Sequence, residues 1–330
     1  MVVLYHILIT SPSFSYHEFP FLFTAISEKS YIGVDFFFVL SGFIILTAHY
    51  ENEEGLSSLK RYSIKRLIRI FSPFLPISVF LVTAYSINPH IGIAERKNFS
   101  VLSSLFLIPA PRPPALPASW TLIHEMVFYT IFSLYFLCRK YFLAAISVWA
   151  IIIAARLPVH WEFFTGLTFE RFLGPINLEF MGGLVCAYIW RKVDAGRTAG
   201  SVLLLAGVIS FAGVLCLDLP KMRWLLLFPF SLILLGGCYL EKAGAIRTPR
   251  LFLLLGDASY AIYLIHMPLF SLVFRAVPAL NRHTVKLGTA NEWAMTAFAA
   301  LIASILVGVL YHRLYERPVI RFLHRKALSP

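Results

Sequence analysis

Long apolar runs alternate with short polar stretches along most of this chain, and few polar residues interrupt the runs. Most of the runs approach the ~20 residues that a helix needs to cross a bilayer. The pattern predicts an all-α fold, a polytopic transmembrane helical bundle of about ten helices. We expect a single domain over residues 1–330 with no appended soluble domain. The apolar segments lie approximately at residues 1–10, 32–49, 70–88, 119–137, 141–157, 173–190, 201–217, 223–240, 255–277 and 293–315.

The first apolar segment is shorter than the others. It covers residues 1–10 and ends at Ser11-Pro12. A helix that starts at Met1 reaches only about 15 Å by residue 10, roughly half of the hydrocarbon core. We therefore expect the first helix to be incomplete at its N-terminus, with further residues before Met1 in the natural protein.

Prolines mark two places where we expect helices to be interrupted. The longest irregular connection, residues 89–118, includes PAPRPPALPAS. So many prolines forbid a regular helix and predict a stiff, extended loop. In the third apolar segment, Pro73 and Pro76 are predicted to break the helix where it enters the membrane, which leaves backbone carbonyls in need of other donors.

Composition excludes the soluble classes. Of the 330 residues, 58% are hydrophobic and 14% are charged, with a mean hydropathy of +0.75, whereas a soluble domain carries about 25% charged residues. The cysteines show no CxxC spacing and no histidine at metal-ligand spacing, so we expect buried free thiols and no metal site. They are Cys138, Cys186, Cys216 and Cys238.

The net charge of +12 would suggest a nucleic-acid partner in a soluble protein. In a membrane protein, Lys and Arg instead collect in cytoplasmic loops, so we expect membrane lipid and no nucleic acid as a partner. With residues 50–69 on the cytoplasmic side, the cytoplasmic loops and the C-terminus hold more of the 29 Lys and Arg residues than the opposite loops do. The bias predicts a multi-pass protein with a cytoplasmic C-terminus.

Three ionisable residues lie at similar expected depth on three apolar segments, namely His6, Asp35 and Glu125. Ionisable side chains inside membrane helices are rare, face the bundle interior and are functional candidates by default. One of them alone would decide nothing. Three at one depth predict a polar site within the bundle.

Aromatic and acidic residues accompany this group. Trp120 and Tyr129 lie on the same segment as Glu125, and Glu179 opens the sixth segment on the expected outer side. Trp120 also fits the aromatic belt at a membrane interface. Glu179 lies so near a helix end that simple solvation explains it as well as a role in the site.

Ser259, Tyr263 and His266 on the ninth segment share one helical face, because their spacings are four and three residues. An intramembrane histidine such as His266 is as often a plain interhelical hydrogen-bond partner as a functional group. Ser259 and Ser41 can also bond back to a carbonyl one turn earlier. The pattern leaves both interpretations open.

Arg66 and Arg69 lie one turn apart at the cytoplasmic entry of the third segment, within KRYSIKRLIRIFSPFLP. Ordinary positive-inside anchoring explains the neighbouring Lys60 and Arg61 well. Two guanidinium groups on one helical face also suit a phosphate. We therefore expect the arginine pair to bind a phosphorylated ligand.

Taken together, these stretches resemble the acyltransferase 3 family of membrane O-acyltransferases. They match the family's motifs in the right order along nearly the whole chain, and the length and the proline-rich loop are most similar to its exopolysaccharide-production acetyltransferase branch. The matching stretches are VVLYH (2–6), GVDFFFVLSGFII (33–45), RLIR (66–69), SWTLIHEMVFY (119–129), GDASYAIYLIH (256–266) and ERP (316–318).

The resemblance implies a reaction and a location. His6 matches the family's catalytic histidine, and Arg66 and Arg69 match the pair associated with the acyl-CoA donor. The implied reaction moves an acyl group, with acetyl as the expected group, from cytosolic acyl-CoA to a hydroxyl of a polysaccharide or lipid-linked oligosaccharide at the bacterial inner membrane. No permanently bound cofactor is expected, and acyl-CoA is a donor substrate. Tyr260, in the late SY motif, joins the supporting residues.

Acyl transfer to a hydroxyl needs a base, oxyanion donors and exclusion of water. His6 is our candidate base, because imidazole titrates near neutrality. Asp35 is expected to fix its tautomer as the aspartate of a triad does, and Glu125 competes for that role. Tyr129, Tyr263 or Ser259 could donate to the oxyanion, and the residues fit both direct transfer and an acyl-histidine intermediate.

Two functions from other classes fit the same residues. A proton-coupled transporter of an anionic solute would use the arginine pair as its entry and His6 with Glu125 as a proton relay. Transporters often contain inverted repeats with paired broken helices, and the sequence shows no such symmetry. A nonenzymatic component of polysaccharide export is the third alternative.

Overall fold

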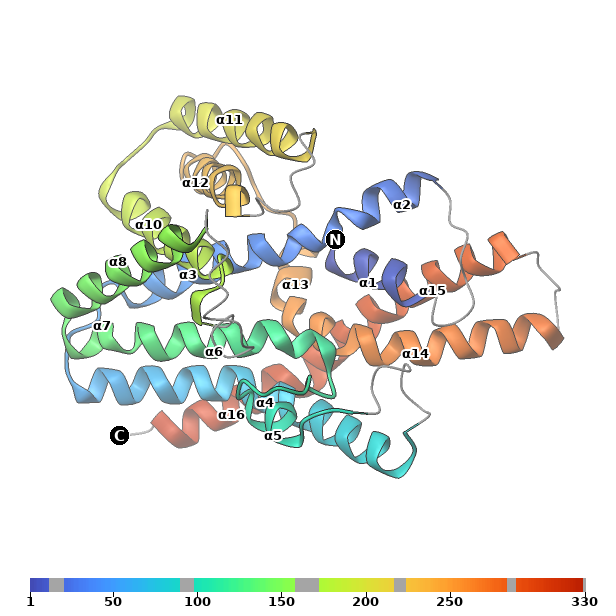
Figure 1. Cartoon of the computed structure of the whole chain (residues 1–330). Helices are drawn as coiled ribbons and strands as arrows, with labels where there is room; N and C mark the ends of the chain where they lie inside the picture. The colour runs from blue at the N-terminus through green and yellow to red at the C-terminus, as the bar shows by residue number, and fades with distance from the viewer. Residues whose placement is uncertain (12–20, 90–97, 158–171, 217–223, 284–288, 329–330) are drawn as a thin grey trace. The chain divides into compact units, whose positions relative to one another are not determined.

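The computed structural model describes residues 1–11, 21–89, 98–157, 172–216, 224–283 and 289–328. Within these ranges the chain forms helices and loops and no β-strand, which confirms the predicted all-α class (Figure 1). In chain order the α-helices are α1 (Val2–Thr10), α2 (Phe21–Glu28), α3 (Gly33–His49), α4 (Leu56–Ile87), α5 (Val101–Phe106), α6 (Trp120–Phe132), α7 (Leu134–Leu137), α8 (Arg139–Arg156), α10 (Ile176–Lys192), α11 (Arg197–Cys216), α12 (Leu227–Lys242), α13 (Arg250–Asp257), α14 (Ser259–His283), α15 (Thr289–Tyr311) and α16 (Arg317–Leu328).

Short helical turns of other kinds join some of these elements. They include the 3₁₀ turns η2 (Ser30–Ile32) and η4 (Pro117–Ser119) and a π-helical turn, η7 (His312–Glu316), between α15 and α16. Such π-helical turns are rare and concentrate at functional sites.

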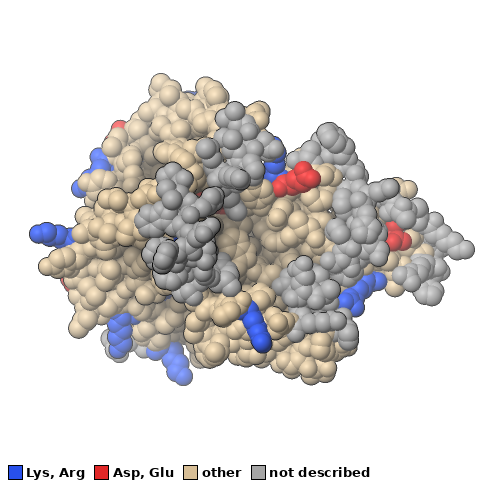
Figure 2. Space-filling model, in the orientation of Figure 1, with Lys and Arg blue, Asp and Glu red and all other residues tan. Residues whose placement is uncertain are grey.

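Seven helical stretches of the described residues are long and apolar enough to cross a bilayer, which supports a multi-pass membrane protein. Charged side chains are sparse on the face drawn in Figure 2, where uncharged surface dominates. The sequence estimate of about ten helices also counted shorter apolar segments. The candidate spans are Ile26–His49, Leu56–Ile87, Pro117–Leu137, Arg197–Cys216, Trp224–Lys242, Ser259–Asn281 and Asn291–Leu328.

The chain forms two compact units. The first unit contains Met1–Ile32, Arg61–Ile123 and Arg250–Pro330, and the second contains Gly33–Lys60 and His124–Pro249. The expectation of a single domain over the whole chain stays a prediction.

In the first unit, α14 and α15 pack along each other, and α1 contacts both (Figure 1). Gly308 of α15 lies directly against Ile262 of α14, where a Cβ atom would collide with the isoleucine. Small residues at such positions let membrane helices approach closely. Helices α14 and α15 are therefore closely packed, and α14 carries most of the GDASYAIYLIH motif (256–266).

In the second unit, α3 packs on α10. Gly42 and Gly183 face each other across this contact, and a Cβ on either would run into backbone of the other helix. Beside them, the ring of Phe180 stacks on Phe128 at a centroid distance of 4.1 Å and meets Phe38 edge-on at 4.6 Å. The glycine contact thus fixes α3, which carries Asp35, against α10.

Helix α4 runs without interruption from Leu56 to Ile87 with Pro73 and Pro76 inside it, so the predicted break is wrong. Proline removes a backbone donor, but membrane helices tolerate it where nearby side chains supply donors. Three hydroxyl groups bond to carbonyls of this stretch. Ser72 donates to Ile68, Tyr260 donates to Ile70, and Tyr311 donates to Pro73.

The long connection before α6 is irregular over residues 107–116, as the prolines predict. Residues 90–97 of this connection lie outside the described residues. Helix α5 was not expected, and it begins after Ser100, whose side chain accepts a hydrogen bond from the backbone N–H of Ser103. Ser78 of α4 donates to the carbonyl of Ser104, which ties this connection to α4. The loop is therefore held by hydrogen bonds in spite of its irregular backbone.

The four cysteines are free, and their environments differ. Cys186 is buried, and Cys138 and Cys238 are half-buried. Cys216 at the end of α11 is exposed, so the expectation of four buried thiols is wrong for that residue. Its position at a helix end, beyond the packed face, explains the exposure.

Candidate active site

The side chains of His6 and His266 contact each other in the first unit. His6 lies on α1 and is 9% exposed, and His266 lies on α14 and is completely buried. Nδ1 of His6 lies 3.2 Å from Nε2 of His266, and the ring centroids are 4.9 Å apart. Of the two alternatives for His266, the interhelical hydrogen bond is the observed one, and its partner is the candidate base itself.

Backbone carbonyls define the tautomer of each ring. Nδ1 of His6 lies 2.9 Å from the carbonyl oxygen of Val2, and Nδ1 of His266 lies 2.6 Å from that of Tyr263. A carbonyl oxygen only accepts, so each Nδ1 carries a proton, and in a neutral ring Nε2 then holds the lone pair. Nε2 of His266 therefore accepts from His6. Nε2 of His6 is the nitrogen that can take a proton.

The hydroxyl of Tyr263 is engaged by the segment that leads into α6. It lies 2.8 Å from the carbonyl oxygen of Ala118 and 2.8 Å from Oγ1 of Thr121. A phenol has a single proton to donate. Both of these partners can accept it, which argues against Tyr263 as an oxyanion donor and for a role in holding α14 against η4.

The acidic candidates Asp35 and Glu125 belong to the second unit. Asp35 in the first turn of α3 is completely buried. Glu125 on α6 is half-buried and accepts a hydrogen bond from the hydroxyl of Tyr129 one turn later. The proposed pairing of either carboxylate with His6 stays a prediction.

Glu179 is 1% exposed on α10, so the explanation by simple solvation is wrong. Three other candidates have intermediate solvent exposure. Ser41, Trp120 and Ser259 are each half-buried, and Ser259 is the first residue of α14. Half-burial is compatible both with a role in the site and with the structural roles considered for these residues, namely an interfacial aromatic for Trp120 and a bond back to a carbonyl for the two serines.

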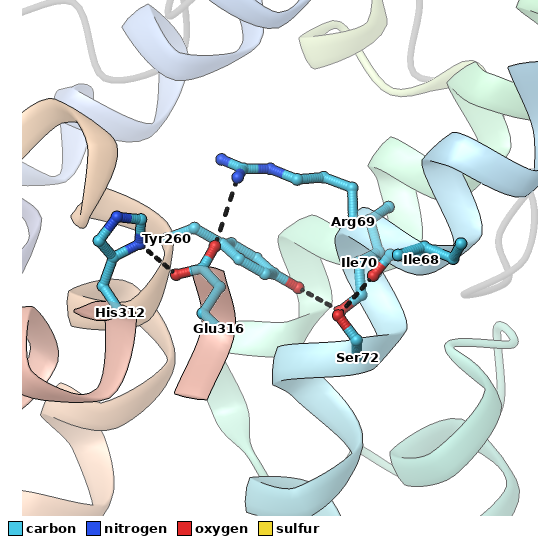
Figure 3. Close-up of polar contacts among 7 residues, drawn as sticks. All are labelled: Ile68, Arg69, Ile70, Ser72, Tyr260, His312 and Glu316. Atoms are coloured by element: carbon cyan, nitrogen blue, oxygen red, sulfur yellow. Dashed lines mark hydrogen bonds and ion pairs between the residues drawn. The ribbon is translucent and has the colours of Figure 1, made fainter. Parts of the chain in front are cut away.

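The predicted donor site also lies in the first unit. Arg66 and Arg69 are on α4, and the guanidinium of Arg66 lies 5.9 Å from the ring centroid of Tyr62. The guanidinium of Arg69 lies 5.9 Å from the ring centroid of Tyr260. Nη1 of Arg69 is 3.4 Å from Oε1 of Glu316 in the π-helical turn η7 (Figure 3).

Sequence reasoning missed Glu316 and its neighbour His312 as members of this site. Glu316 was noted only as part of the ERP stretch near the end of the last apolar segment. A histidine and a glutamate four residues apart lie on one helical face, and this spacing was the available signal. Thr121, the partner of Tyr263, was also missed because threonine is common in membrane helices. In the described residues no group of His, Cys, Asp and Glu could hold a metal ion.

Sequence comparison relates the chain to known proteins. The sequence profile of the acyltransferase 3 family, described as an acyltransferase domain, matches residues 1–313. The exopolysaccharide production protein ExoZ of Rhizobium meliloti is 32% identical over 88% of this chain and 89% of its own length. No solved structure matches the chain.

Two further relatives are more distant. The acyltransferase MdmB of Streptomyces mycarofaciens is 27% identical over 89% of this chain and 82% of its own length. The peptidoglycan O-acetyltransferase OatA of Listeria monocytogenes is 25% identical over 89% of this chain and 52% of its own length. Since the family profile covers nearly the whole sequence and the relatives align with most of it, this chain belongs to the acyltransferase 3 family and is a membrane acyltransferase.

Proposed function

We propose that this protein transfers an acyl group, most simply acetyl, from cytosolic acyl-CoA to a hydroxyl of an exported polysaccharide at the bacterial inner membrane. ExoZ is named for exopolysaccharide production and OatA for O-acetylation of peptidoglycan. These names support a carbohydrate acceptor and an O-acetyl product. The predicted cytoplasmic C-terminus and the arginine pair on α4 support a donor that approaches from the cytosol.

The hydrogen bonding of His6 is the observation that carries this proposal. General-base catalysis requires an unprotonated nitrogen within reach of the acceptor hydroxyl. The Val2 carbonyl holds the His6 proton on Nδ1, so Nε2 is the basic nitrogen of the neutral ring. As the hydroxyl attacks the thioester carbonyl, its proton passes to Nε2. When the tetrahedral intermediate collapses, the C–S bond breaks and the sulfur of coenzyme A takes this proton from Nε2 and leaves as the thiol.

His266 supports the charged state of His6 in this scheme. When Nε2 takes the proton, the His6 ring becomes an imidazolium whose Nδ1–H points at Nε2 of His266 and at the Val2 carbonyl. Charge-assisted hydrogen bonds are stronger than neutral ones. A neutral imidazole can therefore take part of the role that an aspartate has behind a triad histidine.

The test is a reconstituted reaction. The protein in lipid nanodiscs is incubated with acetyl-CoA and polysaccharide from a host strain that lacks the gene, and free thiol and polysaccharide-bound acetyl are both measured. We expect the two products to form in equal amounts. Proton-coupled uptake of an anionic solute into proteoliposomes, without thiol release, would reject the acyltransferase in favour of the transporter. If neither acyl transfer nor uptake is detected, the nonenzymatic role in polysaccharide export remains.

A further inference from the structure

The guanidinium of Arg69 lies among three residues from other elements. Glu316 and His312 come from the π-helical turn η7, and Tyr260 comes from α14 (Figure 3). Nη1 of Arg69 lies 3.4 Å from Oε1 of Glu316, and Nδ1 of His312 lies 2.8 Å from Oε2 of the same carboxylate. The hydroxyl of Tyr260 bonds to the carbonyl of Ile70, next to Arg69 in sequence, at 3.0 Å. The guanidinium of Arg69 thus contacts the carboxylate of Glu316, and the ring centroid of Tyr260 lies 5.9 Å from it.

Glu316 is a completely buried carboxylate. Burying a carboxylate is costly unless donors compensate for the lost water. Here each oxygen has its own donor, Arg69 on one and His312 on the other. The carboxylate is therefore fixed in orientation, and it can fix the arginine in turn.

The Arg69 side chain is 47% exposed although its partner is completely buried. A guanidinium carries five N–H donors, and the pair with Glu316 uses Nη1. One edge of the group thus faces a fixed carboxylate and the rest lies at the boundary of the protein. This is the geometry expected of an arginine that binds an incoming anion while anchored from behind.

The π-helical turn places both anchoring residues inward. The backbone N–H of Arg317 bonds to the carbonyl of His312, five residues earlier. Pro318 follows at once and has no N–H for the α-helical bond to Leu314. The wider turn accommodates this loss, and His312 and Glu316 both become buried.

We propose that Glu316, oriented by His312, is a positioning residue that holds Arg69 ready to bind a phosphate of the acyl-CoA donor. The inference rests on the proposed function, which supplies the phosphorylated ligand. Ordering a long side chain before binding reduces the entropy lost on binding. In the opposite arrangement, Glu316 competes with phosphate for Arg69 through the same contact. Removal of Glu316 would then tighten the binding of coenzyme A.

The test measures the dissociation constant of coenzyme A by calorimetry and the Michaelis constant for acetyl-CoA. For Glu316→Ala we expect both constants to rise roughly threefold to tenfold, the effect of losing one pre-ordered side chain, with little change in kcat. Glu316→Gln keeps an oxygen that accepts from Arg69, so it should bind coenzyme A nearly as well as wild type. Tighter binding by both variants would establish competition and overturn the proposal.

A double variant separates positioning from general packing. Arg69→Ala combined with Glu316→Ala should bind coenzyme A no more weakly than Arg69→Ala alone, because residues that act as one unit are not additive. Additive losses would overturn the proposal. The matched control is Tyr311→Phe, which removes the bond to the Pro73 carbonyl from the same helix end and leaves the guanidinium untouched. It should leave coenzyme A binding unchanged.

Two further outcomes are distinguishable. If wild type does not bind coenzyme A, the proposed donor fails and the inference fails with it. If wild type binds and Arg69→Ala weakens binding while Glu316→Ala does not, only the inference fails. Should Glu316→Ala not fold, His312→Phe keeps the ring bulk and removes the donor to Oε2. It should also raise the dissociation constant, and an unchanged value would overturn the positioning role.

Discussion

Nε2 of His266 lies 3.2 Å from Nδ1 of His6, although the two residues are 260 positions apart in sequence. The contact joins the first described helix to α14, and it gives the candidate base a partner on another helix of the same unit. Nε2 of His266 accepts a hydrogen bond from Nδ1–H of His6 and so constrains the orientation of the His6 ring.

The first prediction concerns His6 itself. His6→Ala should abolish acyl transfer, because removal of a general base typically lowers the rate by about 10²–10⁴-fold. His6→Gln should fail as well, since an amide cannot accept a proton near neutral pH. The measurements are polysaccharide-bound acetyl and thiol release, with yield and coenzyme A binding close to wild type. A well-inserted His6→Ala protein with near wild-type activity would reject His6 as the base.

The second prediction concerns His266. His266→Ala should lower kcat with a smaller effect on the Michaelis constant, because it removes the acceptor that orients His6. His266→Gln should recover part of the activity, since its amide oxygen can accept from Nδ1 of His6. Combining His266→Ala with His6→Ala should add little, as the two act as a unit.

A control tests whether the His266 effect is only loss of a buried hydrogen bond. Trp293 of α15 is buried and donates to Oγ of Ser11 at 3.0 Å, so Trp293→Phe removes an interhelical bond from the same unit. It should lower thermal stability and leave the specific activity of the folded protein near wild type. Equal effects of Trp293→Phe and His266→Ala on kcat would reduce His266 to a packing role.

The third prediction concerns the arginine pair. Arg66→Ala or Arg69→Ala should chiefly raise the Michaelis constant for acyl-CoA, because the phosphates are remote from the bond that is made. Hydrogen bonds to charged groups contribute ~1.5–3 kcal/mol, so the increase should be roughly tenfold to a hundredfold. Arginine to lysine should rescue only in part, since lysine keeps the charge and loses the planar fork. An acyl-CoA dependence like that of wild type would reduce the pair to topological anchors.

The sequence predicts helix positions well because the membrane imposes them. A segment such as Gly33–His49 is apolar over most of its length, and in a bilayer its backbone can be satisfied only as a helix. The pattern fails in α4, where Pro73 and Pro76 indicate a break and the helix is continuous. The hydroxyl groups of Tyr260 and Tyr311, from other elements, donate to carbonyls of this stretch. Those hydroxyls are distant in sequence, so local propensity cannot report them.

The candidate site is less predictable for the same reason. Arg69 and Glu316 are separated by 247 residues, and hydrophobic periodicity shows which face is buried but not which helices meet. The motif residues His6 and His266 could be selected from sequence because ionisable groups in apolar segments are rare. Their mutual contact could not be selected, because it depends on how α1 packs against α14.

The fourth prediction tests the membrane orientation. A single cysteine at Ser57, in a variant without the four natural cysteines, should resist membrane-impermeant thiol reagents in intact cells, whereas one at Pro113 should react. Both positions are exposed on the protein surface, so accessibility within the fold does not bias the result. The expectation follows from the larger number of Lys and Arg residues on the side that contains residues 50–69. The reverse labelling would place Arg66 and Arg69 away from cytosolic coenzyme A.

The last prediction concerns stability of the second unit. Gly42→Ala should sharply lower the yield and thermal stability of the protein, because the new Cβ would meet the carbonyl oxygen of Phe180 in α10 and no side chain can move aside to relieve a backbone clash. Gly237→Ala on α12 is the matched control, since a Cβ there has no atom within 4 Å. Alanine has the higher helix propensity, by about 1 kcal/mol in a helix interior, so this control should be neutral or slightly stabilising. The measurement is the thermal unfolding temperature of both variants and of wild type in the same detergent. If Gly42→Ala unfolds at the wild-type temperature, then α3 and α10 do not pack through their glycines.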